Sequence, residues 1–267
     1  MTTSEQTSTI AVSERASTIK DSITMAISAL AKKMKSQGQD VLSFSAGEPD
    51  FDTPQHIKEA GITAINNGKT KYTPASGIAD LKTTICEKLK TDHGLDYSPK
   101  NIVVSCGAKH SLYNIMLSIL NDGDEVIVPL FTCTATNIPF LNMGADLKFA
   151  DVDVDTLNMD LDHVESLISE KTKAIVPVHY GGLCNDMDRL NKIASQYNVP
   201  VIQDAAHSIG TTYKGKHLTE LSDYVMYSFQ AIKHFTTGDG GMLLVNKELE
   251  DKAKRVRWFG IDRKAKQ

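Results

Sequence analysis

The sequence has little of several features that mark particular classes of protein. Its four cysteines (Cys86, Cys106, Cys133 and Cys184) are isolated and form no CxxC pair, so we expect neither a disulfide framework nor a metal site. Its longest apolar runs, such as NIVVSC and KAIVPV, are strand-length and too short to span a membrane. Lysines and arginines are scattered and the net charge is −4, which gives no basic surface for nucleic acid.

The N-terminus, MTTSEQTSTIAVSER, also lacks the positive-then-apolar pattern of a secretory signal. With 41% hydrophobic and 23% charged residues among 267, the composition is that of an ordinary globular protein. We therefore expect a reduced, cytoplasmic protein with small-molecule partners, no nucleic acid and no membrane.

Helical apolar spacing over residues 19–37 predicts a first helix, which ends near Gly38. The stretch VLSFSAGEPDFDTP, residues 41–54, then predicts a short strand followed by a loop. Later in the chain, β-branched runs alternate with amphipathic segments. The runs that read as strands are 101–106, 124–130, 146–150, 173–178, 199–204, 223–229 and 240–245. The segments that read as helices are 110–120, 159–170, 185–197 and 247–260. This alternation predicts a mostly parallel, doubly wound α/β sheet with helices on both faces.

Two residues at predicted strand ends suggest a specific chemistry. Lys233 follows the strand 223–229 in the loop SFQAIKHFTTGDGG, although alone it reads as a solvated surface lysine. Asp204 ends the apolar run VPVIQD, where open α/β sheets display functional groups, although aspartate there is also a common cap. Pyridoxal phosphate needs a lysine to hold its aldehyde as a Schiff base and a carboxylate beside its pyridine nitrogen. Together, Lys233 and Asp204 fit this cofactor.

A third element is SCGAKHSLYNIM, in which a strand is followed by a turn at Gly107 and Ala108 and then by a helix. Backbone N–H groups at a helix N-terminus form a ready anion site, which a cofactor phosphate would use. In isolation, a glycine used only for a tight turn is at least as good an interpretation.

From Thr132 to Gly260 the chain resembles the DegT/DnrJ sugar aminotransferases, in the pieces FTCTATN, FADVDVDTLNMD, KTKAIVPVHYGG, VIQDAAHSIG, YSFQAIKHFTTGDGGML and RWFGID. This resemblance implies a fold-type I pyridoxal phosphate enzyme with Lys233 as the Schiff-base lysine and Asp204 opposite the pyridine nitrogen. It places His207 near the phenolic oxygen of the cofactor and Ser228 at the phosphate. Cys133 falls where several members carry an aromatic residue stacked on the ring.

From about Val12 to Pro129 the chain is similar to class I aminotransferases of the aspartate type, in LSFSAGEPDFDTP, GKTKYTPASGIADL, YSPKNIVVSCGAKHSLYN and GDEVIVP. This second resemblance implies that Gly47 contacts the substrate carboxylate. It also implies that Tyr72 reaches the phosphate of a neighbouring subunit's cofactor, which predicts a homodimer. The turn Gly107, Ala108 and Lys109 would hold the phosphate.

The two resemblances meet near residues 124–132, which suggests a chimeric chain. They also suggest an N-terminal arm and partial small-domain segment over residues 1–50 and a large cofactor-binding domain over 51–267. The C-terminal small domain of both families and the arginine that class I enzymes use for the substrate α-carboxylate are expected to be missing.

Three functions remain open. The first is an aminotransferase with an acidic amino acid donor and a keto-sugar acceptor, and the second is the same chemistry on a 2-oxo acid. The third is a protein that binds the cofactor without catalysis.

Overall fold

The computed structural model describes residues 13–14, 23–44, 47 and 51–245. The chain divides between Glu48 and Pro49 into two compact units. In the first unit, α2 (Ile23–Ser36) is the helix predicted over residues 19–37, of which residues 19–22 lie outside the described ranges. The strand predicted after it is absent from residues 41–44, which lie in no helix or strand. Within the described chain these residues pair with no second strand, and an extended segment needs one to satisfy its backbone.

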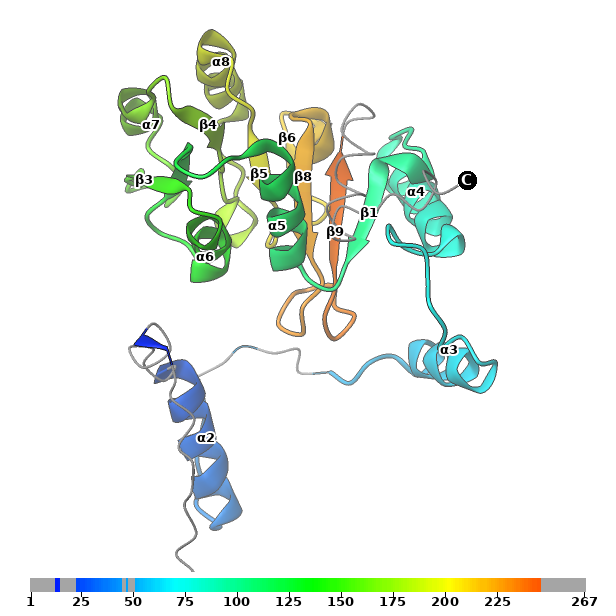
Figure 1. The fold of residues 1–267 in the computed structure, drawn as a ribbon. Helices are drawn as coiled ribbons and strands as arrows, with labels where there is room; N and C mark the ends of the chain where they lie inside the picture. Colours follow the sequence, from blue (N-terminus) through cyan, green and yellow to red (C-terminus); the bar gives the residue numbers. More distant parts are fainter. Residues whose placement is uncertain (1–12, 15–22, 45–46, 48–50, 246–267) are drawn as a thin grey trace, which may run out of the picture. The chain divides into compact units, whose positions relative to one another are not determined.

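The second unit alternates strands and helices after two initial helices (Figure 1). Its longer helices are α3 (Gln55–Asn66), α4 (Ala79–His93), α5 (Ala108–Ile119), α6 (Thr134–Asn142), α7 (Leu161–Leu167) and α8 (Met187–Tyr197). The strands are β1 (Ile102–Ser105), β2 (Glu125–Pro129), β3 (Asp146–Ala150), β4 (Thr172–Ile175), β5 (Ile202–Asp204), β6 (Thr212–Tyr213), β7 (Lys216–His217), β8 (Tyr224–Ser228) and β9 (Gly241–Val245). Short 3-10 turns are η1 (Pro99–Asn101), η2 (Tyr180–Gly182) and η3 (Leu218–Glu220).

The main strands form one sheet in the order β1-β9-β8-β5-β4-β2-β3. Two hydrogen-bonded groups, β1-β9-β8-β5 and β3-β2-β4, are joined by parallel bridges between Ile175 and Val201 and between Val178 and Asp204. Strand β9 runs antiparallel to both of its neighbours, and the pairs β5–β8, β2–β3 and β2–β4 are parallel. The prediction of a mostly parallel α/β sheet is therefore confirmed.

Strand β2 lies where the order of connection reverses, because β3 is beside it on one side and β4 on the other. In open α/β sheets this switch point opens a crevice at the carboxyl ends of the strands, where ligands bind.

Helices cover both faces of the sheet. Alternate residues of β2 show this directly: Val126 and Val128 pack in the same apolar cluster as Phe140 of α6, whereas Ile127 packs with Leu190 of α8. A third cluster joins α4 to β1, β8 and β9. Because β2 is buried on both faces, its sequence EVIVP is nearly all apolar instead of alternating.

Side-chain caps fix several helix ends near the sheet. Asp160 accepts hydrogen bonds from the backbone N–H groups of Asp162 and His163 at the start of α7, and Asp186 accepts one from Arg189 at the start of α8. Helix α4 ends at Gly94, whose φ of 72° is in the left-handed region that glycine adopts without a steric penalty.

Helices α3, α4 and α6 and the hairpin β6–β7 were not predicted from the sequence, and the helix predicted over 247–260 lies outside the described residues. None of the helices in the described ranges combines the length and the apolar character that crossing a bilayer requires.

Strand β9 begins at a glycine because the turn before α5 lies directly against it. A Cβ atom at Gly241 would come within 2.4 Å of the backbone carbon and oxygen of Gly107. No real Cβ tolerates such an approach, so we predict that Gly241→Ala forces the turn at Gly107 away from β9. Overpacking of this kind costs about 1–3 kcal/mol, which a urea unfolding midpoint measures.

Gly61→Ala is the matched control, since no atom lies within 4 Å of a Cβ atom at Gly61 in α3. It should leave the midpoint unchanged or raise it slightly. Equal midpoints for Gly241→Ala and the wild-type chain would contradict the prediction.

Candidate active site

A cavity of about 330 Å³ opens at the carboxyl ends of the parallel strands. Its wall comes from the turn before α5, the start of α6 after β2, the ends of β5 and β8, and the loop between β8 and β9. All the residues predicted from the sequence except Gly47 and Tyr72 line it, namely Gly107, Ala108, Lys109, Cys133, Asp204, His207, Ser228 and Lys233. Parts of the chain more than a hundred residues apart are thus brought to one place.

Asp204 is the last residue of β5 and is only 4% exposed. The hydroxyl of Thr136 donates a hydrogen bond of 2.8 Å to one carboxylate oxygen, and the backbone N–H of Ala206 donates one of 3.0 Å to the other. Burial raises the pKa of the Asp204 carboxyl, while these two hydrogen bonds and the charge of Lys233 act in the opposite direction. The carboxylate therefore gains from any further cation or donor in the cavity.

Lys233 lies in the loop between β8 and β9, where its backbone N–H donates to the carbonyl of Gln230 at 2.9 Å. The side chain is half-buried, and this burial lowers the pKa of its amine against the raising effect of Asp204 and Cys133. A lower pKa increases the neutral, nucleophilic fraction of a lysine near pH 7. Lys233 is therefore a candidate nucleophile in this cavity.

The turn before α5 forms another part of the cavity wall. Gly107 is the N-terminal cap of α5, so the first backbone N–H groups of that helix point out of its N-terminus. Close packing of Gly241 against Gly107 and Ala108 fixes this turn on the sheet. Lys109 adds an exposed positive charge to the same wall. An anion such as a phosphate group would be stabilised here.

The other predicted residues surround these three groups. His207 is half-buried, and the pKa of its imidazole is lowered by burial and by the nearby charges of Lys233 and His234. Ser228 ends β8, and Cys133 is the exposed N-terminal cap of α6. Sequence reasoning missed Thr136, although it lies in FTCTATN, because only the fold shows that its hydroxyl faces Asp204.

Of the other two predicted residues, Tyr72 does not line the cavity in this single chain, and Gly47 belongs to a different unit from the one that forms it. Tyr72 is 94% exposed. Gly47 belongs to the first compact unit, and the residues on either side of it lie outside the described ranges. Their predicted roles stay predictions.

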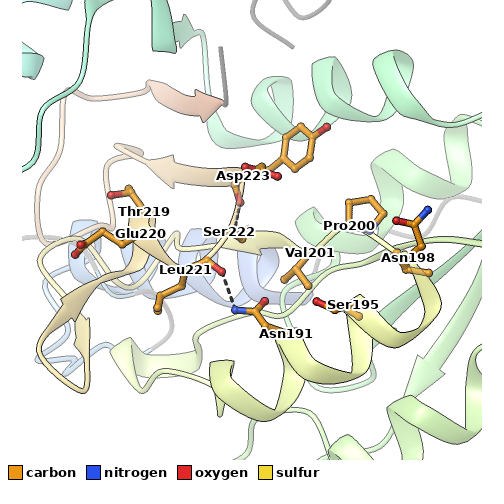
Figure 2. Close-up of a pocket in the computed structure, with 13 residues that line it drawn as sticks. Asn191, Ser195, Asn198, Pro200, Val201, Thr219, Glu220, Leu221, Ser222 and Asp223 are labelled. Carbon is orange, nitrogen blue, oxygen red and sulfur yellow. Dashed lines mark hydrogen bonds between the residues drawn. The ribbon is translucent and has the colours of Figure 1, made fainter. Parts of the chain in front are cut away.

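A second hollow of about 560 Å³ lies between α8 and the segment Thr219–Tyr224 (Figure 2). Asn191 donates a hydrogen bond of 2.8 Å to the carbonyl of Leu221 across it. Glu220 and Asp223 line this hollow and no lysine, arginine or histidine does. Although it is larger, no cationic side chain lines it, so the cavity at Lys233 is the candidate active site.

The fold is that of the fold-type I aminotransferases. Aspartate aminotransferase from Thermus thermophilus with maleate has the same fold, with a TM-score of 0.77 and 28% identity over 93% of this chain and 68% of that chain. 3-Amino-5-hydroxybenzoic acid synthase matches with a TM-score of 0.67 and 29% identity over 78% of this chain and 53% of that chain.

The family is shown by sequence. The model of the DegT/DnrJ/EryC1/StrS aminotransferase family matches residues 61–267, and the chain belongs to this family. The match begins far before Thr132 and runs through the region 124–132 where the two resemblances meet. Whether the chain is a chimera stays a prediction.

Curated relatives carry aspartate-type names. The aspartate aminotransferase of Bacillus subtilis is 36% identical over 222 residues, which are 79% of this chain and 56% of the relative. The probable aspartate/prephenate aminotransferase of Aquifex aeolicus is 40% identical over 188 residues, 68% of this chain and 48% of the relative. The chain thus spans about half the length of these relatives.

The buried carboxylate makes stability depend on pH. Below the ordinary aspartate pKa, Asp204 is protonated in both the folded and the unfolded chain. As the pH rises, the unfolded chain ionises first, because burial raises the pKa in the folded chain. We predict that the free energy of unfolding of the cofactor-free wild type falls relative to that of Asp204→Asn as the pH rises above about 4. Urea unfolding at stepped pH measures it, and a pH-independent difference would contradict it.

The hydroxyl of Thr136 opposes this cost, since it donates to the carboxylate. Thr136→Val is therefore expected to lower the free energy of unfolding at pH 7 by about 1.5–3 kcal/mol, the value of a hydrogen bond to a charged group. Thr136→Ser keeps the hydroxyl and should lose less than half as much. A loss in Thr136→Ser as large as that in Thr136→Val would contradict this prediction, because serine retains the hydroxyl that donates to Asp204.

Proposed function

We propose that the chain is a pyridoxal 5'-phosphate-dependent aminotransferase, with the cofactor bound in the cavity at Lys233. The observation that carries this proposal is that one cavity joins an amine, a buried carboxylate and a helix N-terminus. Each of the three matches a different part of the cofactor: its aldehyde, its ring nitrogen and its phosphate.

The residues present fit this group. Asp204 has one donor on each carboxylate oxygen and so retains acceptor capacity, which a protonated ring nitrogen would use. Such a cation would also offset the cost of keeping this carboxylate ionised in a buried position. At the other end, the close contact between Gly241 and Gly107 leaves the α5 turn rigid, as a phosphate site requires.

Pyridoxal phosphate, when bound, supplies an electron sink for breaking bonds at the substrate amine carbon. The protein supplies the rest. Lys233 would hold the cofactor through its Nζ atom and, when released by a substrate amine, would move the proton, a task suited to an amine with a lowered pKa. Ser228, Ala108 and Lys109 would bind the phosphate, and Cys133 would pack beside the ring.

For the substrates, we propose an acidic amino acid such as glutamate or aspartate as the donor and a keto-sugar as the acceptor. Membership of the DegT/DnrJ/EryC1/StrS family supports the sugar acceptor. The second candidate is a 2-oxo acid acceptor, supported by the aspartate-type names of the curated relatives and by the motif around Gly47.

We further propose a cytoplasmic homodimer in which Tyr72 reaches the phosphate of the partner subunit's cofactor. The high exposure of Tyr72 in the single chain is consistent with this role. A monomer in light scattering at micromolar concentration, in the presence of the cofactor, would argue against it.

The proposal predicts a covalent bond between the cofactor and Lys233. Pyridoxal 5'-phosphate added to the chain should produce a visible absorption band. Borohydride reduction followed by peptide mass spectrometry should then find the cofactor's mass on the peptide that contains Lys233. Lys233→Ala should lose both signals, whereas Lys100→Ala, which removes an exposed lysine outside the cavity, should keep them. Labelling spread over surface lysines, or no band, would contradict the proposal.

Activity measurements distinguish the keto-sugar aminotransferase, the 2-oxo acid aminotransferase and the protein that binds the cofactor without catalysis. Loss of the band on addition of glutamate or aspartate would show the first half-reaction, and no response to any donor would leave cofactor binding alone. A screen of 2-oxo acids against nucleotide-linked keto-sugars then decides the acceptor.

A further inference from the structure

The loop between β4 and α8 is tied to the segment that follows Asp204. The backbone N–H of His179 donates to the carbonyl of Asp204 at 3.2 Å, and the hydroxyl of Ser208 donates back to the carbonyl of His179 at 3.0 Å. Further on, the hydroxyl of Thr211 donates to the carbonyl of Gly182 at 3.2 Å. These contacts give residues 179–182 a fixed place beside the cavity wall.

The buried ring of His179 also holds this loop in place. It is fully buried, and its Nδ1 atom accepts the backbone N–H of Asn185 at 3.2 Å, so its proton is on Nε2 and is donated to Gln203 at 2.8 Å. Gln203 in turn donates to the carbonyl of Leu218 at 2.8 Å. Burial lowers the pKa of His179 to about 4, so the ring is neutral and this network is intact at neutral pH.

The anchored loop meets His207 at three points. The backbone N–H of Gly181 donates to Nδ1 of His207 at 3.4 Å. The ring of Tyr180 lies edge-on to the imidazole with 5.7 Å between centroids, and Phe131 packs on Tyr180 at 4.6 Å. A Cβ atom at Gly182 would lie 3.3 Å from the carbonyl oxygen of His207, so the loop passes close to the backbone there.

An imidazole nitrogen that accepts a hydrogen bond carries no proton, so the contact with Gly181 defines the state of His207. We infer that Tyr180 and the Gly181 amide hold His207 as its Nε2–H tautomer, an uncharged hydrogen-bond donor on the cavity wall. A neutral donor suits this position, because a second cation beside Lys233 would be repelled. With respect to its acceptor the inference rests on the proposed function: the Nε2–H group would donate to the phenolic oxygen of the bound cofactor.

Tyr180 is thus a positioning residue, and the state of His207 can be measured without the cofactor. In the cofactor-free chain with ¹⁵N-labelled histidine, NMR correlations between ring nitrogens and carbon-bound protons distinguish the tautomers, and His207→Gln identifies the signals. We expect His207 to show an unprotonated Nδ1 and a protonated Nε2 at pH 7. Tyr180→Phe keeps the ring and should preserve this state. Tyr180→Leu keeps the Gly181 amide but removes the ring that packs against the imidazole. The imidazole should then turn away from that amide, give a mixture of tautomers and, with less burial, have a pKa closer to the ordinary value of about 6.5.

An Nδ1–H tautomer or a doubly protonated His207 in the wild-type chain would overturn the inference, as would a Tyr180→Leu variant with wild-type signals. Since no cofactor is present, these results are independent of the proposed function. Cofactor affinity adds a second test: Tyr180→Leu should weaken binding about fivefold, the effect of one hydrogen bond of about 1 kcal/mol. Equal affinities for Tyr180→Leu and Tyr180→Phe would show that the positioning has no role in binding.

Discussion

The burial of one carboxylate is the constraint on which the rest of the site depends. Asp204 is almost inaccessible to water, and an ionised carboxylate in such a place is costly unless donors and cations surround it. Its donors come from two separate parts of the chain, Thr136 at the start of α6 and Ala206 after β5. The positive charge that favours its ionised form comes from Lys233, in the loop after β8. The segments that follow β2, β5 and β8 must therefore lie at the same edge of the sheet for the ionised carboxylate to be stable.

The burial of Asp204 also depends on the contact between the two parts of the chain that precede and follow residues 124–132. The turn at Gly107 precedes the region 124–132, and Asp204 and Lys233 follow it. Strand β2 crosses that region, is buried throughout and pairs with both β3 and β4. The residues directly after β2 lead into α6, which contains Thr136. Any shift of β2 along the sheet would therefore displace the Thr136 hydroxyl from the Asp204 carboxylate. The cavity is continuous across the two resemblances because they share this strand.

Much of this was predictable from the sequence, and the failures have physical causes. Strands such as β2 and β8 are runs of β-branched and apolar residues, and the sequence places Asp204 at a strand end and Lys233 in the loop after β8. Helix α6 was missed because it contains Pro139, and α4 because most of its residues are exposed, which weakens the apolar period. The antiparallel pairing of β9 with β1 and the contact of Gly181 with His207 each join segments that are well separated in the sequence, and no local pattern encodes such contacts.

The central claim is that a single cavity holds the cofactor by its phosphate at the α5 N-terminus and by its ring nitrogen at Asp204. A crystal structure of the chain with pyridoxal 5'-phosphate tests it most directly. We expect density continuous with the Nζ atom of Lys233, with the phosphate on the backbone N–H groups at Gly107 and Ala108. The ring nitrogen should lie within hydrogen-bond distance of the Asp204 carboxylate. A cofactor bound in the hollow beside Glu220, or one in the cavity with its phosphate away from α5, would contradict it.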